Sequence, residues 1–574
     1  MKRCPKCNRT EADDSLTFCR TDGTPLVRGS GAVSDSEGTL KLPPSQSTDT
    51  SETRVLPTGE AADRPTAPTT MLEGGRASGG TPGLSKPKSR RGVALAAAAV
   101  IAVIVAAFAY LYLARGESAA AKDSVAVLPF QNASSDPNME YLSDGITESL
   151  INSLSQLPNV RVMASSTMFS FKGKGLSPQA VGRELGVDAV LAGRVVQSGD
   201  SLSVQAELVD ASDGTQMWGE RYSRRMADVQ AVQDEIVRDV SQKLHARLSG
   251  VGQQGAGSSH TANPEAYQLY LKGRFFWNKR SLKDTETAVR YFQQAIAADP
   301  SFAHPFSGLA DSYVNMALFE SGAPPHEVMP KARDAALKAI TLDERLSEAH
   351  AALGFVLFLY DYDFARAERE FQRSLELNPS YETAHQRYSF LLTALGRHEE
   401  SLAEMRRALE IDPLSLMVNR SYGDRLIDAR KYEEAVAQLR KTLELDGNFA
   451  LPYSSLAKVH EVRGDYAASV EEIAKAYELT GRQEYAALAR ESFAKGGWQG
   501  YLRAMLERRP DLRAYIRATH HIALGEKDKA FAELNNSYEN REGYMTLLKV
   551  DPRLDPLRSD PRFAELVRKV GLPQ

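Results

Sequence analysis

The sequence lacks cysteine over almost its whole length. Of 574 residues only Cys4, Cys7 and Cys19 are cysteines. A disulfide framework is therefore excluded downstream of residue 19, whereas three thiols this close in sequence can share one site. The sequence also lacks an excess of either charge, because the formal net charge is only -4. No basic stripe interleaved with aromatic residues occurs either, so no nucleic-acid partner is expected.

Motifs that carry catalysis are missing as well. The sequence has no H-E-x-x-H pair and no protein-kinase signature, and "FKGKG" at residues 171–175 lacks the spacing of a phosphate-binding loop. Asp144 and Glu148 lie four residues apart on one side of an expected helix. Like charges there favour a solvated helix start over an acid–base pair. These absences predict a protein that is not an enzyme.

Long hydrophobic runs are absent with one exception. Residues 92–114 carry no charge over 23 positions, and a helix rising about 1.5 Å per residue would let them cross a hydrocarbon core of about 30 Å. Four basic residues lie within residues 86–91, and only two lie within residues 115–122. By the positive-inside rule we predict a single-pass protein of the inner (cytoplasmic) membrane. Its N-terminus would be cytoplasmic and its C-terminal domains periplasmic or otherwise extracytoplasmic.

The segment before this run divides into a head (residues 1–27) and a linker (28–91). The linker is rich in Ser, Thr, Pro and Gly and has no apolar periodicity, so we expect it to be disordered. In the head, Cys-x2-Cys places two thiolates on one knuckle, as zinc sites require, and "FCRTDG" begins a second knuckle. A usual zinc ribbon has its fourth cysteine where this sequence has an aspartate. We predict a structural Zn²⁺ site with these ligands: Cys4, Cys7, Cys19 and Asp22.

Two alternatives to this site stay open. A water molecule can replace Asp22, or the head can be a relic ribbon with free thiols. The head resembles short bacterial zinc-ribbon heads of the "CPxC…FCxxDG" kind. A catalytic zinc is not expected, because the stretch is too short to form a pocket.

Residues 122–250 alternate between strand and helix patterns. Apolar runs and helical periods predict the order βαβαβββα, with "SGD" and "SDG" as hairpin turns between the last three strands. The phrases "VAVLPFQN", "YLSDGITESLINSLSQLPNVRVMASSTMFSFKGK", "GRELGVDAVLAGRV" and "DASDGTQMWGERYSRRMADVQAVQDEI" resemble the TolB-amino-terminal-like domain of bacterial membrane-anchored signalling proteins. Members of that family often carry a kinase, cyclase or winged-helix domain before one membrane helix, for which this chain has no room. The resemblance implies an extracytoplasmic, non-enzymatic, protein-binding module without catalytic residues.

From residue 263 the sequence repeats. Asn378, Asp412 and Asp446 are evenly spaced, Asp343 precedes them at almost the same interval, and Asp299 precedes Asp343 at a longer one. An interval of about 34 residues is that of tetratricopeptide repeats, in which Asp-Pro or Asn-Pro ends the second helix. We predict five repeats within residues 263–480, then divergent helical repeats and a cap over 481–574. The fold class is thus multidomain: a zinc-ribbon-like head, one transmembrane helix, an α/β domain and an all-α solenoid.

The first helix of each repeat in such solenoids lines a face that receives a peptide. Repeat positions give these candidate partner-binding residues: Gln386, Phe390, Arg420, Asp424, Ser454 and Lys458. The alternative for each is a solvated surface residue. His304, His350 and His385 recur near the starts of repeats, where helix packing accounts for them better than a metal or catalytic role.

These features together predict a membrane-anchored scaffold or sensor. It would bind a protein or peptide partner outside the cytoplasm and lie in the lipid bilayer through one helix. Relay to the cytoplasmic head is a further hypothesis, and a homodimer would allow a single helix to transmit it. The alternative is a non-signalling assembly factor for envelope or secretion machinery.

Overall fold

The computed structural model describes residues 123–134, 136, 139–157, 160–245, 261–279, 281–319 and 322–573, with the backbone of residues 2–3, 10–11 and 27–28. The chain forms two compact units, residues 1–97 and 98–574. In the first, strand β1 (Lys2–Arg3) pairs antiparallel with β2 (Thr10–Glu11) and with β3 (Val27–Arg28). The predicted zinc ligands and the predicted membrane helix 92–114 lie outside the described residues. None of the helices described is long and apolar enough to cross a membrane.

The second unit begins with an α/β region built on a six-stranded sheet of order β6-β4-β7-β8-β9, with β5 paired to β7. Strands β4, β5 and β6 run parallel to their neighbours, whereas β7, β8 and β9 form antiparallel hairpins. The strands are β4 (Asp123–Val127), β5 (Gln131–Asn132), β6 (Val160–Val162), β7 (Ala189–Ser198), β8 (Ser201–Asp210) and β9 (Gln216–Arg225). The helices are α2 (Glu140–Ser155), α3 (Ser165–Phe169), α4 (Pro178–Leu185) and α5 (Val229–His245), with a 3-10 turn η2 (Met226–Asp228) before α5.

The predicted order βαβαβββα is present with two additions, β5 and α3. Alternation explains the sheet, because Leu202, Val204, Ala206 and Leu208 of β8 are all fully buried and the residues between them are not. The two additions carry no such pattern. Strand β5 has two residues and α3 has five, which is too short for a hydrophobic period to appear in the sequence.

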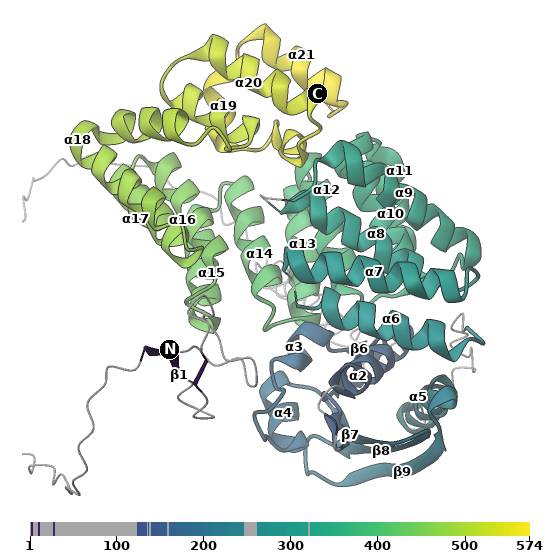
Figure 1. Cartoon of the computed structure of the whole chain (residues 1–574). Coiled ribbons are helices and arrows are strands. Elements are labelled where there is room, and N and C mark those ends of the chain that lie inside the picture. Colours follow the sequence, from purple (N-terminus) through teal and green to yellow (C-terminus); the bar gives the residue numbers. More distant parts are fainter. Residues whose placement is uncertain are drawn as a thin grey trace, which may run out of the picture. The chain divides into compact units, whose positions relative to one another are not determined.

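The rest of the unit is a mostly helical, tetratricopeptide-like solenoid (Figure 1). Between residues 264 and 479 the described chain forms six helical hairpins, one more than predicted. The sixth was missed because its B helix ends at Thr480, where the B helices of the other five hairpins end at an Asp or Asn. We call the first helix of each hairpin an A helix and the second a B helix. The hairpins are α6 (Pro264–Trp277) with α7 (Leu282–Ala298), α8 (Ala303–Leu318) with α9 (Pro325–Leu342), α10 (Ser347–Val356) extended by the π-helical turn η3 (Leu357–Asp361) with α11 (Phe364–Leu377), α12 (Glu382–Ala394) with α13 (His398–Ile411), α14 (Leu416–Asp428) with α15 (Tyr432–Leu445), and α16 (Ala450–Arg463) with α17 (Tyr466–Leu479).

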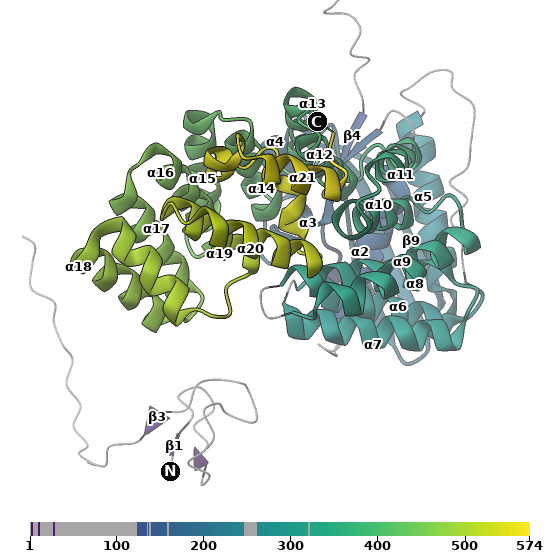
Figure 2. The same ribbon diagram turned by 90° about the horizontal axis from the view of Figure 1, so that it is seen from above.

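After the hairpins comes α18 (Gln483–Arg508), which is kinked at Gly497, where φ is 60°. We call residues 511–573 the C-terminal segment. It contains α19 (Ala514–Ala523), α20 (Lys527–Glu539), the 3-10 turns η4 (Gly543–Leu547) and η5 (Pro552–Leu557), and α21 (Pro561–Val570). Both views show α19–α21 extending from α18 toward α12 (Figure 1, Figure 2), and η4 packs on η3 and α12.

The Asp and Asn residues that revealed the repeat have a common role. In four of the five turns between hairpins, the side-chain Oδ1 accepts a hydrogen bond from the backbone N–H two residues later. These four are Asp299, Asp343, Asn378 and Asp446, with N···O distances of 2.9, 3.0, 3.1 and 2.8 Å. Asp412 is the exception.

Asp412 turns instead to helix α3 of the α/β region. Its Oδ1 accepts from the backbone N–H of Thr167 at 3.0 Å and from the Thr167 hydroxyl at 2.6 Å, and its Oδ2 accepts from the Ser166 hydroxyl. The N-cap residue of α3, Ala164, has no polar side chain with which to cap the helix. A carboxylate from the solenoid therefore caps a helix in the α/β region.

Further contacts join the α/β region to the solenoid. Asn378 donates from Nδ2 to the Ser155 hydroxyl at 2.8 Å. Glu148 of α2 is buried and accepts from Arg274 Nε and Asn278 Nδ2, both at 2.9 Å. The prediction of a solvated Glu148 is therefore wrong, because its partner Arg274 on α6 lies 126 residues away in sequence and gave no local signal.

Candidate functional site

The predicted partner-binding residues lie on three successive A helices, α12, α14 and α16. We call the side of these helices that carries the six residues the A-helix face. Gln386 and Phe390 come from α12, Arg420 and Asp424 from α14, and Ser454 and Lys458 from α16. Because each pair is one repeat length from the next, equivalent turns of successive repeats lie at the same height on this face.

Polar contacts link neighbouring A helices across this face. Gln386 Nε2 donates to the Ser421 hydroxyl at 2.9 Å. Arg420 pairs with Asp424 at 2.8 Å, and Asp424 accepts from the Ser455 hydroxyl at 2.6 Å. The structure thus brings Gln386, Arg420 and Asp424 into contacts between or along A helices. The contacts of Phe390 and Lys458 lie further along the helices.

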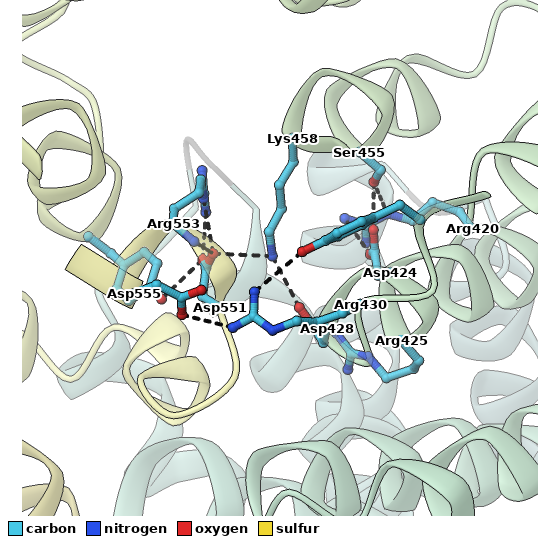
Figure 3. A network of polar contacts seen from close by, with 12 residues as sticks. Arg420, Asp424, Arg425, Asp428, Arg430, Ser455, Lys458, Asp551, Arg553 and Asp555 are labelled. Carbon is cyan, nitrogen blue, oxygen red and sulfur yellow. Dashed lines mark hydrogen bonds and ion pairs between the residues drawn. The ribbon is translucent and has the colours of Figure 1, made fainter. Parts of the chain in front are cut away.

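The C-terminal half of the A-helix face is covered by the C-terminal segment (Figure 3). Lys458 Nζ lies 3.1 Å from Asp428 Oδ1 and 3.6 Å from Oδ1 of Asp551, which precedes η5. Arg430 donates to Asp555 at 2.8 Å, joining the α14–α15 turn to the same segment. Phe390 packs under the Arg425 guanidinium at 4.4 Å, and Arg425 pairs with Asp428 at 2.9 Å.

Asp551 is the centre of this half. Its side chain is 0% exposed and lies 2.8 Å from Arg553 Nη2, and it also accepts from the Tyr515 hydroxyl at 3.2 Å. Burial alone would raise the pKa of Asp551, but the charges of Arg553 and Lys458 outweigh it and hold this pKa well below its ordinary value. Asp551 is therefore an ionised carboxylate that binds two cations from different parts of the chain.

Two titratable side chains beside Asp551, Glu461 and His520, have pKa values shifted toward their neutral forms. Burial raises the pKa of Glu461, because the nearby Arg553 compensates only in part. Burial, helped by the charge of Arg553, lowers the pKa of His520 to about 3, and the ring Nδ1 is enclosed without a hydrogen-bond partner among the described residues. His520 is thus a neutral ring at physiological pH.

The N-terminal half of the A-helix face is open to solvent. Met417 is 40% exposed and Leu451 is 41% exposed, and they occupy the same position of consecutive repeats. Ser454 is also exposed, and the Arg420 side chain is 28% exposed. This half therefore combines two apolar contacts with hydrogen-bonding groups.

Sequence reasoning missed several residues of the site. It chose Ser454, but the hydroxyl that bonds Asp424 belongs to the next residue, Ser455. Asp428 could have been found, because it lies four residues after Asp424 on the same side of the helix. Asp551 and Arg553 could not, because they lie far from Lys458 in sequence and no repeat relates them.

A hollow of about 380 Å³ lies between the α8–α9 connection and the C-terminal segment. The charged side chains that line it already make hydrogen bonds or ion pairs within the protein. Arg513 donates to the Phe319 carbonyl at 3.0 Å, Arg517 pairs with Glu533 at 2.7 Å, and Glu542 accepts from the N–H groups of Ala514 and Tyr515 that begin α19. We therefore place the candidate site on the A-helix face.

In the part of the chain that the structure describes, no group of His, Cys, Asp and Glu could hold a metal ion. The predicted zinc ligands Cys4, Cys7, Cys19 and Asp22 are not among those residues. Their zinc site stays a prediction.

Two family models match parts of the chain. A tetratricopeptide-repeat model matches residues 383–413, which form the α12–α13 hairpin, so the chain carries repeats of this kind. A model described as HilA/YgeH-like transcriptional regulator, second domain, matches residues 121–239, the α/β region. The resemblance of this region to TolB-amino-terminal-like domains stays a prediction.

Relatives and solved structures complete the comparison. The chain is 33% identical over 241 residues to the Rhizobium meliloti (strain 1021) protein named "Putative adenylate cyclase 3", a match covering 41% of this chain and 40% of that one. Among solved structures, YrrB, described as "a TPR protein with an unusual peptide-binding site", is 18% identical with a TM-score of 0.25 and covers 35% of this chain and 97% of its own. A thermophilic TPR protein of Thermus thermophilus, TTC0263, is 16% identical with a TM-score of 0.28, and the match covers 36% of this chain and 98% of that one. TM-scores this low carry no inference about function.

Proposed function

We propose that this chain is a scaffold that binds an extended peptide on the open half of its A-helix face. One observation carries the proposal: two exposed apolar side chains, Met417 and Leu451, recur at one position of consecutive repeats. A regularly spaced apolar pair on a solenoid suits alternate side chains of an extended segment. Arg420 beside them has N–H groups to donate to the carbonyls of such a segment.

The covered half does not suit the same role. Lys458 is the cation that a peptide carboxylate would seek, but it already pairs with Asp428 and Asp551. A ligand there would have to displace a fully buried carboxylate and leave Arg553 without its partner, which costs several kcal/mol. We therefore assign recognition to Met417, Leu451, Arg420 and Ser454.

The wider setting belongs to the proposal as well. We place the chain in the inner membrane through residues 92–114, with the zinc-ribbon-like head in the cytoplasm and the α/β and repeat regions outside. The charge asymmetry around the apolar run supports this orientation. Binding outside would then be relayed to the head. The alternative, a non-signalling assembly factor, uses the same A-helix face.

The name of the Rhizobium meliloti relative raises a competing proposal, a cyclase. The match spans less than half of either chain, and the sequence shows no catalytic constellation. A test for cyclic AMP formation by the full chain separates the two proposals, since a scaffold forms none.

The binding proposal is tested by crosslinking and pull-down of the full chain from native membranes. The variant Met417→Glu/Leu451→Glu places charge on the open half. The control Leu337→Glu/Leu445→Glu changes two apolar side chains of similar exposure, 37% and 40%, on B helices. We expect one partner to disappear with the first variant and to remain with the control. Equal capture by both variants would refute the assignment to this face.

A further inference from the structure

One position of the A helices makes the same contact in four successive repeats. It is the fourth residue after the N-cap, occupied by His350, His385, Asn419 and Tyr453. Each side chain reaches the backbone carbonyl of the residue six positions earlier, in the preceding turn. The distances are 3.0 Å to Glu344, 3.0 Å to Pro379, 2.8 Å to Pro413 and 3.0 Å to Gly447. This contact staples each A helix to the turn before it.

Three of these side chains also bind the B helix of their own hairpin. His350 Nδ1 lies 2.7 Å from Glu370, and His385 Nδ1 lies 2.5 Å from Glu404. The next repeat has the neutral version, because Gln438 Nε2 donates to Asn419 Oδ1 at 2.8 Å. Glu370, Glu404 and Gln438 occupy the same position of three consecutive repeats.

The histidine–glutamate version and the asparagine–glutamine version of this contact differ in the number of protons that they need. Asn419 donates with its amide nitrogen and accepts with its oxygen, so no proton is gained or lost. Each histidine instead places both ring nitrogens against oxygens, one of a carboxylate and one of a carbonyl. A neutral imidazole has one N–H and can satisfy only one of them, whereas the imidazolium satisfies both.

The His385 staple also lies at a contact with the α/β region. Its carbonyl partner Pro379 stands between Asn378, which donates to Ser155, and Ser380, whose hydroxyl donates to the Val160 carbonyl at 3.4 Å. Among the described residues, the turn of the His350 staple, residues 343–346, has no hydrogen bond to the α/β region. The turn that begins at Asp412 also contacts the α/β region, but its carbonyl, that of Pro413, accepts from Asn419 instead of a histidine.

The surroundings of the His385–Glu404 pair are closed. The side chains are 5% and 12% exposed, and Arg407 on α13 holds the other oxygen of Glu404 at 3.0 Å. Glu382 is the charged residue at the start of the same helix. The side chains beside Pro379 in this turn are uncharged: Asn378 donates to Ser155 of α2, and Ser380 donates to the Val160 carbonyl. Tyr381 stays neutral, because burial raises its pKa well above the ordinary value.

We propose that the His385–Glu404 pair is a proton-dependent latch that holds the docked turn, residues 378–381, against the α/β region. The protonated ring fixes the Pro379 carbonyl and Glu404 together. On deprotonation one of the two bonds is lost, and the turn that carries Asn378 and Ser380 is released from one end.

The test measures hydrogen–deuterium exchange of the full chain at pH 6.0 and at pH 8.5. The rates are corrected for the intrinsic pH dependence of exchange. The two pH values lie on either side of about 6.5, the pKa of an ordinary histidine. We expect protection of residues 160–164 and 376–382 to fall by about tenfold at the higher pH, the effect of one charge-assisted hydrogen bond. The variant His385→Asn/Glu404→Gln copies the pair that Asn419 and Gln438 already form in this chain. It should abolish the pH dependence.

Two controls make the test specific. The variant His350→Asn/Glu370→Gln removes the same chemistry from an undocked turn and should leave the pH dependence at residues 160–164 and 376–382 intact. Within the wild-type chain, residues 410–416 should not lose protection at high pH. Burial raises the pKa of Asp412, so any titration of this carboxyl strengthens its hydrogen bonds as pH rises. Equal protection of 376–382 at both pH values, or a pH dependence that survives in His385→Asn/Glu404→Gln, would overturn the latch.

Discussion

The two halves of the A-helix face contrast in how the chain uses them. The N-terminal half presents Met417, Leu451 and Ser454 to solvent. The C-terminal half carries Lys458, which pairs both with Asp428 of α14 and with Asp551 of the C-terminal segment. The same three helices thus provide an open surface and an internal interface, a short way apart along each helix.

This contrast shows that a position in a repeat does not determine its use. Phe390, Asp424 and Lys458 occupy one repeat position, yet each has a different neighbour. Phe390 packs under Arg425, Asp424 accepts from Ser455, and Lys458 pairs with Asp551. Where charges are fully enclosed, removing one partner is costly, and where side chains face water, it is not. The two halves should therefore respond very differently to substitution.

The largest effect is expected from Asp551→Ala in the covered half. The substitution leaves the buried Arg553 without its carboxylate and Lys458 with Asp428 alone, which should cost about 3–5 kcal/mol. Urea denaturation of the full chain, followed by circular dichroism, measures this loss. Because the pKa of Asp551 is lowered, its contribution is present above about pH 4, its unfolded range, and is lost as pH falls below it.

Asp555→Ala is the matched control for this prediction. Asp555 lies four residues away and pairs with Arg430, but both side chains are more than 40% exposed. Such a pair should contribute at most about 1 kcal/mol. If both variants lost the same stability, the distinction between a buried and an exposed carboxylate in this segment would be wrong.

A smaller effect on stability is expected at His520, where the fold favours the neutral side chain, whereas at Asp551 it favours the charged one. Its pKa of about 3 means that the folded chain holds a neutral ring while the unfolded chain takes up a proton below about pH 6.5. Stability should therefore fall as pH drops from 6.5. His520→Phe should reduce the difference in stability between pH 7 and pH 5 by at most about 2 kcal/mol.

Thermal melts at the two pH values test this expectation. His326→Phe serves as the control, because the His326 side chain is 62% exposed. An unchanged pH dependence in His520→Phe would show that the ring is not held neutral.

The smallest effects on stability are expected from substitutions of two adjacent serines, Ser454 and Ser455. Ser455→Ala removes the hydroxyl that donates to Asp424 at 2.6 Å and should cost about 1 kcal/mol. Ser454→Ala, at an exposed position, should change stability by less than about 0.5 kcal/mol. Chemical denaturation of the two variants side by side gives the answer. Equal losses would place both hydroxyls in the same environment.

Much of the fold could be predicted from the sequence because its signals are local. The Asp and Asn residues that end the B helices make hydrogen bonds within two residues of themselves, so their regular spacing is visible without a structure. The order of strands and helices in the α/β region follows from alternation and helical periods. The short elements β5 and α3 escaped because a period needs length.

The candidate site could be predicted only in part. Repeat positions place Arg420 and Asp424 on one helix, where the two side chains form an ion pair, and their role in binding a partner stays a prediction. They could not show that Lys458 pairs with Asp551, or that Glu148 pairs with Arg274, because these contacts join distant segments. Nor could they separate Ser454 from Ser455, whose difference is the direction of one side chain on a helix.

The docking of the α/β region has a consequence for how the chain can change length. Arg274 of α6 binds Glu148, Asn378 binds Ser155, and Asp412 caps α3, so the α/β region is attached at three places along the solenoid. The α/β region therefore fixes the length of solenoid between these places. A whole repeat inserted between residues 278 and 412 would move at least one attachment away from the others by a repeat, and the α/β region could not keep all three. An insertion after residue 412 would leave the spacing of the three attachments unchanged.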